Sequence, residues 1–144
     1  MKITTTRFGT ISVKKDKIIY MPSGMLGFPE RKHFVLFGHK ENSPFFWYQS
    51  VDDPSLAFVV TSPFLFVPDY NVEADEAAKS MSWNDADEND LELYVVANIP
   101  KGEPDKITAN LIGPILINIR KRQAVQMVIP SSPYSHKFPL AGRK

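Results

Sequence analysis

The sequence predicts an all-β, mostly antiparallel fold: a small barrel-like single domain of residues 1–144 with one short surface helix near residues 72–82. Twelve prolines and seven glycines divide the 144 residues into short segments, and β-branched and aromatic residues fill the segments between them. Short strands with turn residues at regular intervals are typical of β-sandwiches and β-barrels. Only one stretch carries helical signals, and no linker is long enough to separate two domains.

Eight segments have the composition of strands, because each is rich in β-branched or aromatic residues and is bounded by turn residues. They cover residues 17–21, 33–37, 45–50, 57–61, 92–99, 106–111, 115–119 and 124–129. In the third, alternation directs Phe45 and Trp47 to one face and Phe46 and Tyr48 to the other. We expect core packing on both faces. The alternative is that one face supplies aromatic contacts to a partner, with Tyr48 as the candidate residue.

One helix is predicted over residues 72–82. Asn71 precedes it as a capping residue, and acidic side chains in its first turn complement the helix dipole. Its apolar stripe is weak, so we expect it to lie on the surface. The last stretch, residues 131–144, holds two prolines and three basic residues and is expected to be partly loose.

Composition excludes several classes of protein. Hydrophobic residues make up 43% and charged residues 23% of the chain, which is typical of globular proteins. The absence of cysteine excludes thiolate catalysis, cysteine-ligated zinc and iron–sulfur clusters, and it fits a reducing cytosol. The N-terminus lacks the apolar region of a secretory signal, and the longest apolar stretch, residues 111–117, is too short to span a membrane. We therefore expect a cytoplasmic protein.

The net charge of +1 conceals an uneven distribution along the chain. Residues 1–40 carry +6, residues 41–105 carry −12, and residues 106–144 carry +7. Two interpretations stay open. Segregated charge presents strong local fields to a partner, or the basic ends fold beside the acidic middle and neutralise it.

A metal site finds little support in the sequence. Asp85, Asp87 and Asn89 alternate as the early ligands of a calcium loop do, but Asp90 stands where such a loop needs glycine and Val96 where it needs glutamate. A solvated acidic loop explains this partial match better, so no metal or other cofactor is expected.

Enzymatic activity is not expected either. The three histidines, His33, His39 and His136, lack the spacing of a metal-binding pair, and no nucleophile elbow or phosphate-binding glycine loop is present. Asp52 and Asp53 form a carboxylate pair, but neighbouring residues at a strand end point to opposite faces. With Pro54 following, they indicate a turn.

A nucleic-acid-binding β-barrel is the alternative function. The basic run of residues 120–122 falls between two predicted strands, at a hairpin position. However, the aromatic residues 45–48 lie in the acidic third of the chain, which repels phosphate.

Several short motifs recur in an order and spacing that resemble one known family. They are Gly24–Phe28, Phe34, Pro44–Ser50, Asp52–Phe58, Pro63, Pro68–Tyr70, Asn110–Asn118 and Gln123–Gln126. Over roughly residues 8–140 the chain resembles the FliW family of flagellar assembly factors. Two positions depart from the family pattern: Tyr48 stands where we expect leucine, and Gly113 stands where we expect alanine. Within these motifs, Gly24 and Gly27 are expected to permit a positive φ or a close backbone approach.

The resemblance implies a non-enzymatic regulator without a cofactor. Proteins of this family bind flagellin in the cytoplasm and, alternatively, the RNA-binding translational repressor CsrA, which they antagonise. It also implies a small, mostly antiparallel β-barrel. The free protein is expected to be a monomer. Asn110 and Asn118 are candidates for contact with the backbone of a partner, and the alternative is that they only bond to neighbouring loops.

Acidic side chains are densest over residues 73–92, which hold eight acids and one base. A partner that binds RNA carries a basic surface, and an acidic face is attracted to it. Asp85, Asp87, Glu88 and Asp90 are therefore candidate contacts with CsrA. The alternative is that these acids only keep a surface loop soluble.

Overall fold

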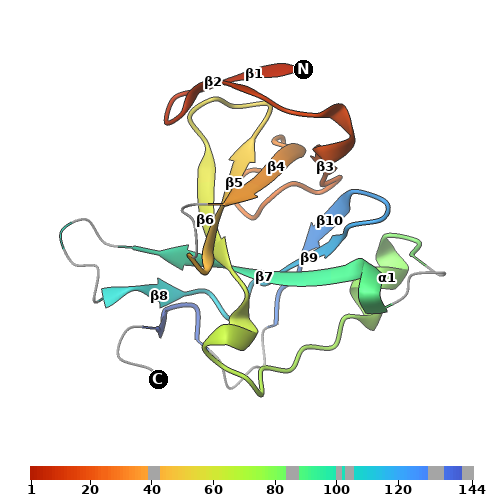
Figure 1. Ribbon diagram of the computed structural model, residues 1–144. Helices are drawn as coiled ribbons and strands as arrows, with labels where there is room; N and C mark the ends of the chain where they lie inside the picture. The colour runs from red at the N-terminus through yellow and green to blue at the C-terminus, as the bar shows by residue number, and fades with distance from the viewer. Residues whose placement is uncertain (39–42, 84–87, 100–101, 103–105, 130–134, 141–144) are drawn as a thin grey trace.

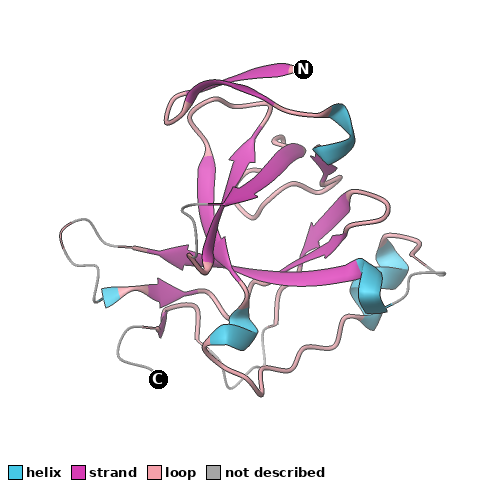
Figure 2. Cartoon of the chain, in the orientation of Figure 1, coloured by secondary structure: helices cyan, strands magenta, loops and turns pink. Residues whose placement is uncertain are grey.

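The computed structural model describes residues 1–38, 43–83, 88–99, 102, 106–129 and 135–140 (Figure 1). Within these ranges the chain forms a two-stranded sheet and a nine-stranded sheet (Figure 2). The small sheet pairs β1 (Lys2–Thr5) with β2 (Gly9–Ser12). The large sheet contains β3 (Ile19–Tyr20), β4 (His33–Gly38), β5 (Phe45–Ser50), β6 (Ala57–Thr61), β7 (Leu91–Asn98), β8 (Thr108–Ala109), β9 (Ile115–Asn118), β10 (Gln123–Gln126) and β11 (Phe138–Pro139).

Most of the large sheet closes on itself. The hydrogen-bonded order runs β7–β6–β5–β4–β3–β10–β9, and β9 pairs back onto the first half of β7. β8 pairs with the last two residues of β7, and β11 pairs with β8. Among the described ladders only β3–β10 is parallel. The predicted all-β, mostly antiparallel, barrel-like fold is confirmed.

Alternate residues of the strands fill the barrel. Phe34 and Tyr48 are fully buried, and their rings stack with centroids 4.5 Å apart. Phe46 packs against the same cluster of apolar side chains. Phe45 instead packs against a second cluster on the outer side of the sheet, so β5 is covered on both faces, as its alternation predicts.

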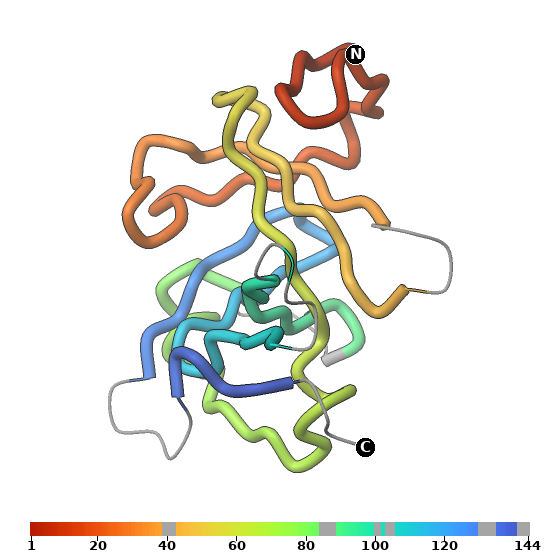
Figure 3. Tube along the Cα trace, turned by 90° about the vertical axis from the view of Figure 1, so that its left-hand side faces the viewer, coloured from red at the N-terminus to blue at the C-terminus, as the bar shows by residue number. Residues whose placement is uncertain are grey.

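The β1–β2 hairpin, at the opposite end of the molecule from β8 (Figures 1 and 3), was not predicted. Its turn carries Phe8, whose ring meets Phe37 and Trp47 edge to face at 5.0 and 5.2 Å. The Arg7 guanidinium lies over the Trp47 ring, 4.6 Å from its centroid. The hairpin therefore covers the outward-facing aromatic residues of β4 and β5.

A second apolar cluster lies under the segment that follows β6. The 3-10 helix η2 (Pro63–Leu65) turns the chain, and Val67 and Tyr70 then pack against Val95 of β7 and Leu111. The Tyr70 hydroxyl donates to the Leu111 carbonyl. This cluster extends the core beyond the barrel.

The helix α1 (Asp75–Ser80) lies inside the predicted range of 72–82 and is shorter. Its N-cap is Ala74, which makes no side-chain cap bond, so the capping role expected of Asn71 is wrong. Asn71 lies four residues before the first helical residue, beyond the reach of a cap.

Strand ends also differ from the prediction. The strand expected over 17–21 is limited to β3, because residues 15–17 form the 3-10 helix η1 (Lys15–Lys17). Of the tail over residues 131–144, the described part supplies β11 and places Leu140 in the second cluster, 4% exposed.

Candidate protein-interaction site

Trp83 fixes the start of the acidic segment to the barrel. After α1, the N–H of Ser82 bonds to the Lys79 carbonyl and the N–H of Trp83 to the Ala78 carbonyl. These two bonds make a Schellman motif, and Ser82 adopts the left-handed conformation, φ +59°, that the motif requires. The Trp83 indole is 3% exposed, and its Nε1–H donates to Oε1 of Gln123 in β10 at 2.7 Å.

Asp90 fixes the other end of the segment. It closes the 3-10 helix η3 (Glu88–Asp90), and its carbonyl accepts the N–H of Ile119 at 2.8 Å. Its carboxylate lies 3.5 Å from Nε of Arg120. Both ends of the acidic segment are thus attached to the β9–β10 hairpin, beside which α1 also lies (Figure 1).

The four acids predicted to contact CsrA belong to this segment of the sequence. Asp85 and Asp87 lie outside the described residues. The Glu88 backbone begins η3, and its side chain is likewise outside what the structure describes. Asp90, with a side chain 22% exposed, is shielded by its position against the hairpin. Sequence reasoning missed Trp83, although a tryptophan at the start of a polar run is a signal of an anchored loop.

The basic run of residues 120–122 occupies the turn between β9 and β10, the predicted hairpin position. All three side chains are exposed. Asn118 shapes the turn, because its Oδ1 accepts the N–H groups of Arg120 and Lys121. The Asp90–Arg120 pair brings the acidic middle of the chain against its basic C-terminal third, so part of the charge segregation is neutralised locally.

Two of the predicted contact residues are buried. Tyr48 is inside the barrel, and burial raises the pKa of its hydroxyl. Asn118 is 0% exposed and is used in the hairpin turn. Neither side chain reaches the surface, so the expectation that they touch a partner directly does not fit this fold.

Asn110 belongs to a second turn that joins several of the family-like motifs. Its Oδ1 accepts the N–H of Ile112 at 3.2 Å. Gln126 donates to the Gly113 carbonyl at 2.9 Å and accepts the N–H of Leu26 at 2.8 Å. A Cβ on Gly113 would lie 2.8 Å from Nδ2 of Asn110. The glycine that departs from the family pattern therefore leaves room for the Asn110 amide.

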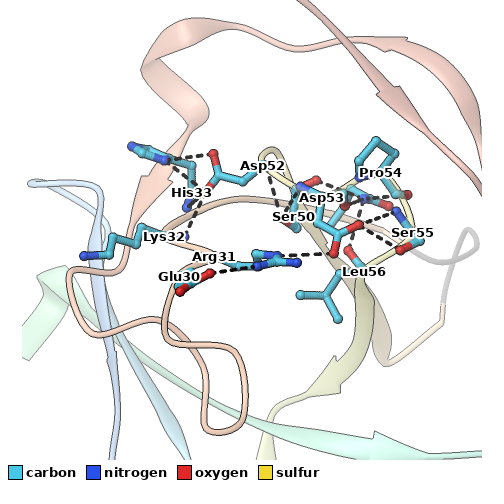
Figure 4. A network of polar contacts seen from close by, with 11 residues as sticks. Glu30, Arg31, Lys32, His33, Ser50, Asp52, Asp53, Pro54, Ser55 and Leu56 are labelled. Atoms are coloured by element: carbon cyan, nitrogen blue, oxygen red, sulfur yellow. Dashed lines mark hydrogen bonds and ion pairs between the residues drawn. The ribbon is translucent and has the colours of Figure 1, made fainter.

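A polar clamp holds the β5–β6 turn against the segment before β4 (Figure 4). Asp52 accepts the N–H groups of Lys32 and His33 and lies 3.2 Å from Nδ1 of His33. Asp53 pairs with Arg31 at 3.2 Å and accepts both donors of Ser55. The two carboxylates face different partners and form a turn, as predicted.

The clamp lowers the pKa of both carboxyl groups. Burial opposes ionisation of Asp52, but its bonds from the Lys32 N–H and from His33 outweigh burial. For Asp53 the bonds from Ser55 contribute most, and Arg31 adds to them. A carboxyl group whose pKa is lower in the folded state contributes its full stabilisation at pH values above its unfolded pKa of about 4. This stabilisation is lost as the pH falls through the folded pKa.

We therefore expect the free energy of unfolding to fall as the pH is lowered from 5 to 3, and this slope to be smaller in Asp52→Asn. Urea denaturation at a series of pH values measures it. Glu73→Gln, which removes an exposed carboxylate outside the clamp, is the matched control and should keep the parental slope. Equal slopes for Asp52→Asn and the parent would contradict the role given to the clamp.

Neither a metal-ligand cluster nor a membrane-spanning helix occurs in the described ranges. Across these residues, no three histidine, aspartate or glutamate side chains gather in a way that fits a metal ion. No helix of the same ranges has the length and apolar character needed to cross a membrane.

Comparison with known proteins gives a consistent result. The FliW protein family model matches residues 2–140. A protein named flagellar assembly factor FliW from Magnetococcus marinus is 42% identical over 142 residues, covering 97% of this chain and 85% of its own length. The Bacillus subtilis protein of that name is 38% identical, covering 99% and 98%. A crystal structure of a flagellar assembly factor FliW superposes with a TM-score of 0.87 at 34% identity, covering 100% of this chain and 99% of the other. The chain belongs to the FliW family.

Proposed function

We propose that this protein is a cytoplasmic flagellar assembly factor that acts without catalysis, by binding flagellin and, alternatively, the RNA-binding repressor CsrA. Family membership over nearly the whole chain is the observation that carries the proposal. In this account flagellin occupies the protein while it accumulates. Once flagellin is consumed, the free protein binds CsrA and relieves translational repression.

The acidic segment between Trp83 and Asp90 is the proposed contact with CsrA. Hydrogen bonds attach its two ends to the barrel. At one end the Trp83 indole N–H donates to Gln123 Oε1 at 2.7 Å, and at the other the Asp90 carbonyl accepts the N–H of Ile119 at 2.8 Å. In the sequence, three acids lie between these two ends: Asp85, Asp87 and Glu88. Fixed end points lower the entropy that a segment loses when it binds a partner.

Electrostatics gives this segment its effect on RNA. A basic RNA-binding surface attracts the acids and accelerates association. Charges act over about 8 Å at physiological salt, so the segment must dock close to the RNA groove to repel RNA from it. Asp90 contributes less, since Arg120 already lies beside its carboxylate.

The triple variant Asp85→Asn, Asp87→Asn, Glu88→Gln tests this contact. We expect association with CsrA to slow by about tenfold at low salt and to depend less on salt, because steering by charge accounts for such factors. Stopped-flow association at several salt concentrations measures both quantities, and displacement of a labelled RNA from CsrA measures the effect on RNA.

The matched control removes three exposed acids elsewhere in the acidic third, with Asp69→Asn, Asp75→Asn and Glu76→Gln. It changes the net charge by the same amount and should alter association much less. Equal rates in the triple variant and the parent would leave the segment as a solvated loop. Tight binding of RNA by the protein itself would favour the alternative function, with the hairpin of residues 120–122 as the binding site.

We also propose that the free protein is a monomer, which light scattering measures.

A further inference from the structure

One edge of the strand β4 is paired with β3 over only part of its length. β3 pairs with it only at Phe34 and His33, because η1 replaces the rest of the expected β3 strand. The His33 carbonyl accepts the Val51 N–H of the segment after β5, and the Lys32 carbonyl accepts the Met21 N–H beyond β3. Since backbone groups alternate along a strand, those of Val35 and Phe37 face β5.

The same alternation turns the N–H and C=O groups of Leu36 and Gly38 toward the open edge. No hydrogen bond to another described residue engages these groups. A Cβ built on Gly38 would meet nothing within 4 Å, so the face of the strand is open at this residue. An exposed strand edge of this kind pairs readily with an additional strand.

Two hollows adjoin this edge, one on each side of it, and Leu36 and Lys17 line both. The outer hollow, about 380 Å³, lies between β2 and the outward-facing side chains of Val35 and Phe37. The inner hollow, about 230 Å³, is lined by Ile19, Leu36 and Ile117 of the barrel core and by the exposed Ile119. Side chains of an added strand alternate between its two faces, so they would enter the two hollows in turn.

Charge distinguishes the two hollows. The outer one carries Lys14 and Lys17 and no acidic side chain. In the inner one, Asp16 and Glu92 balance Lys17 and Arg122 around the isoleucines. The outer hollow therefore favours carboxylates, and the inner hollow favours aliphatic side chains.

We propose that the edge of β4 at Leu36 and Gly38 binds an extended segment of a partner protein by antiparallel strand addition. The segment carries aliphatic side chains on one face and carboxylates on the other. Main-chain bonds to Leu36 and Gly38 supply affinity, and the two hollows supply sequence preference. We assign the antiparallel direction, which is also the direction in which both described neighbours of β4 pair with it.

Hydrogen exchange in the free protein gives the first test. The Leu36 amide should exchange at least tenfold faster than the amides of Val35 and Phe37, which bond to β5. A Leu36 amide as slow as its neighbours at every protein concentration would show that the edge is already covered and would overturn the proposal. If slow exchange appears only at high concentration, a second copy of this chain is the occupant, which also overturns it.

Titration of ¹⁵N-labelled protein with the peptide acetyl-Glu-Val-Glu-Ile-Glu-amide gives the second test. In an antiparallel pair, the peptide residues opposite Leu36 and Gly38 have their side chains on the face of the inner hollow, so Val and Ile take these two positions and their amides form the bonds. We expect shifts at the Leu36 and Gly38 amides, loss of binding when the Val and Ile amides are N-methylated, and retained binding when the second and third Glu amides are N-methylated. Equal binding of both N-methylated peptides would overturn the proposal.

Protein variants complete the test. Gly38→Pro removes an edge N–H while leaving the β4–β5 bonds, and should weaken the peptide about fivefold, the effect of one hydrogen bond. Lys14→Glu with Lys17→Glu should weaken it at least tenfold at low salt, whereas Lys15→Glu, on the same 3-10 helix but outside both hollows, should change it less than twofold. Thermal unfolding checks that each variant folds. Folded variants that all bind like the parent would contradict the assigned site.

Discussion

Replacing Gln49 with glutamate is expected to lower the free energy of unfolding at pH 7 by about 4 kcal/mol, the cost of an uncompensated buried charge. Gln49 is 0% exposed, and its Nε2 donates to the carbonyls of Ser50 and Leu56 at 2.9 and 3.1 Å. The carbonyls of Asp53 and Pro54 lie within 3.4 Å of the same nitrogen. In a carboxylate, an oxygen would replace this donor nitrogen and face the four carbonyl oxygens.

The pH dependence identifies this cause. Burial raises the pKa of the new carboxyl group above its unfolded value of about 4.3. Its protonated form is tolerated better, so the loss of stability relative to the parent is smallest below the unfolded pKa and grows as the pH rises through the folded pKa. Gln49→Met, of similar shape and without charge, is the matched control. Urea denaturation from pH 4 to 8 measures both, and a pH-independent loss equal to that of the control would contradict the explanation.

Gly24→Ala is expected to cost about 3 kcal/mol, from a left-handed backbone and from steric overlap. Gly24 has a φ of +63°, and a Cβ there would lie 2.5 Å from the Phe28 carbonyl oxygen and 2.8 Å from Cα of Pro29. Both contacts are backbone atoms, which cannot move aside as a side chain can. The turn also places Met25, 3% exposed, in the barrel core.

Gly27→Ala separates the two contributions. Gly27 has a φ of +86°, but a Cβ there would meet nothing within 4 Å. This control therefore carries only the backbone cost, about 1–2 kcal/mol. Thermal and urea unfolding of both variants measure the difference, and equal losses would show that the close approach at Gly24 has no energetic weight.

Local signals in the sequence predicted most of the barrel. The run from Phe45 to Ser50 became β5 with the expected ends, because alternation and flanking turn residues define a strand locally. The glycines expected to allow unusual backbone geometry, Gly24 and Gly27, both have positive φ. Closure of the ring through β7 and β9 was beyond prediction, since it depends on pairing between distant segments.

The candidate site was predicted less completely. Alternation placed Tyr48 on one face of β5, but it does not say which face is covered, and the barrel closed over it. Asn118 has the polar side chain of a contact residue, yet the hairpin turn uses its oxygen. The attachment of Trp83 to Gln123 joins residues 40 positions apart, and no local pattern specifies such a bond.

A competition assay tests the central claim most directly. A labelled RNA bound to CsrA is titrated with this protein, and fluorescence anisotropy reports the bound fraction of the RNA. Flagellin is then added to the same mixture. The account predicts that the protein releases the RNA and that flagellin restores RNA binding by withdrawing the protein from CsrA. An RNA-bound fraction that changes with neither addition would contradict it.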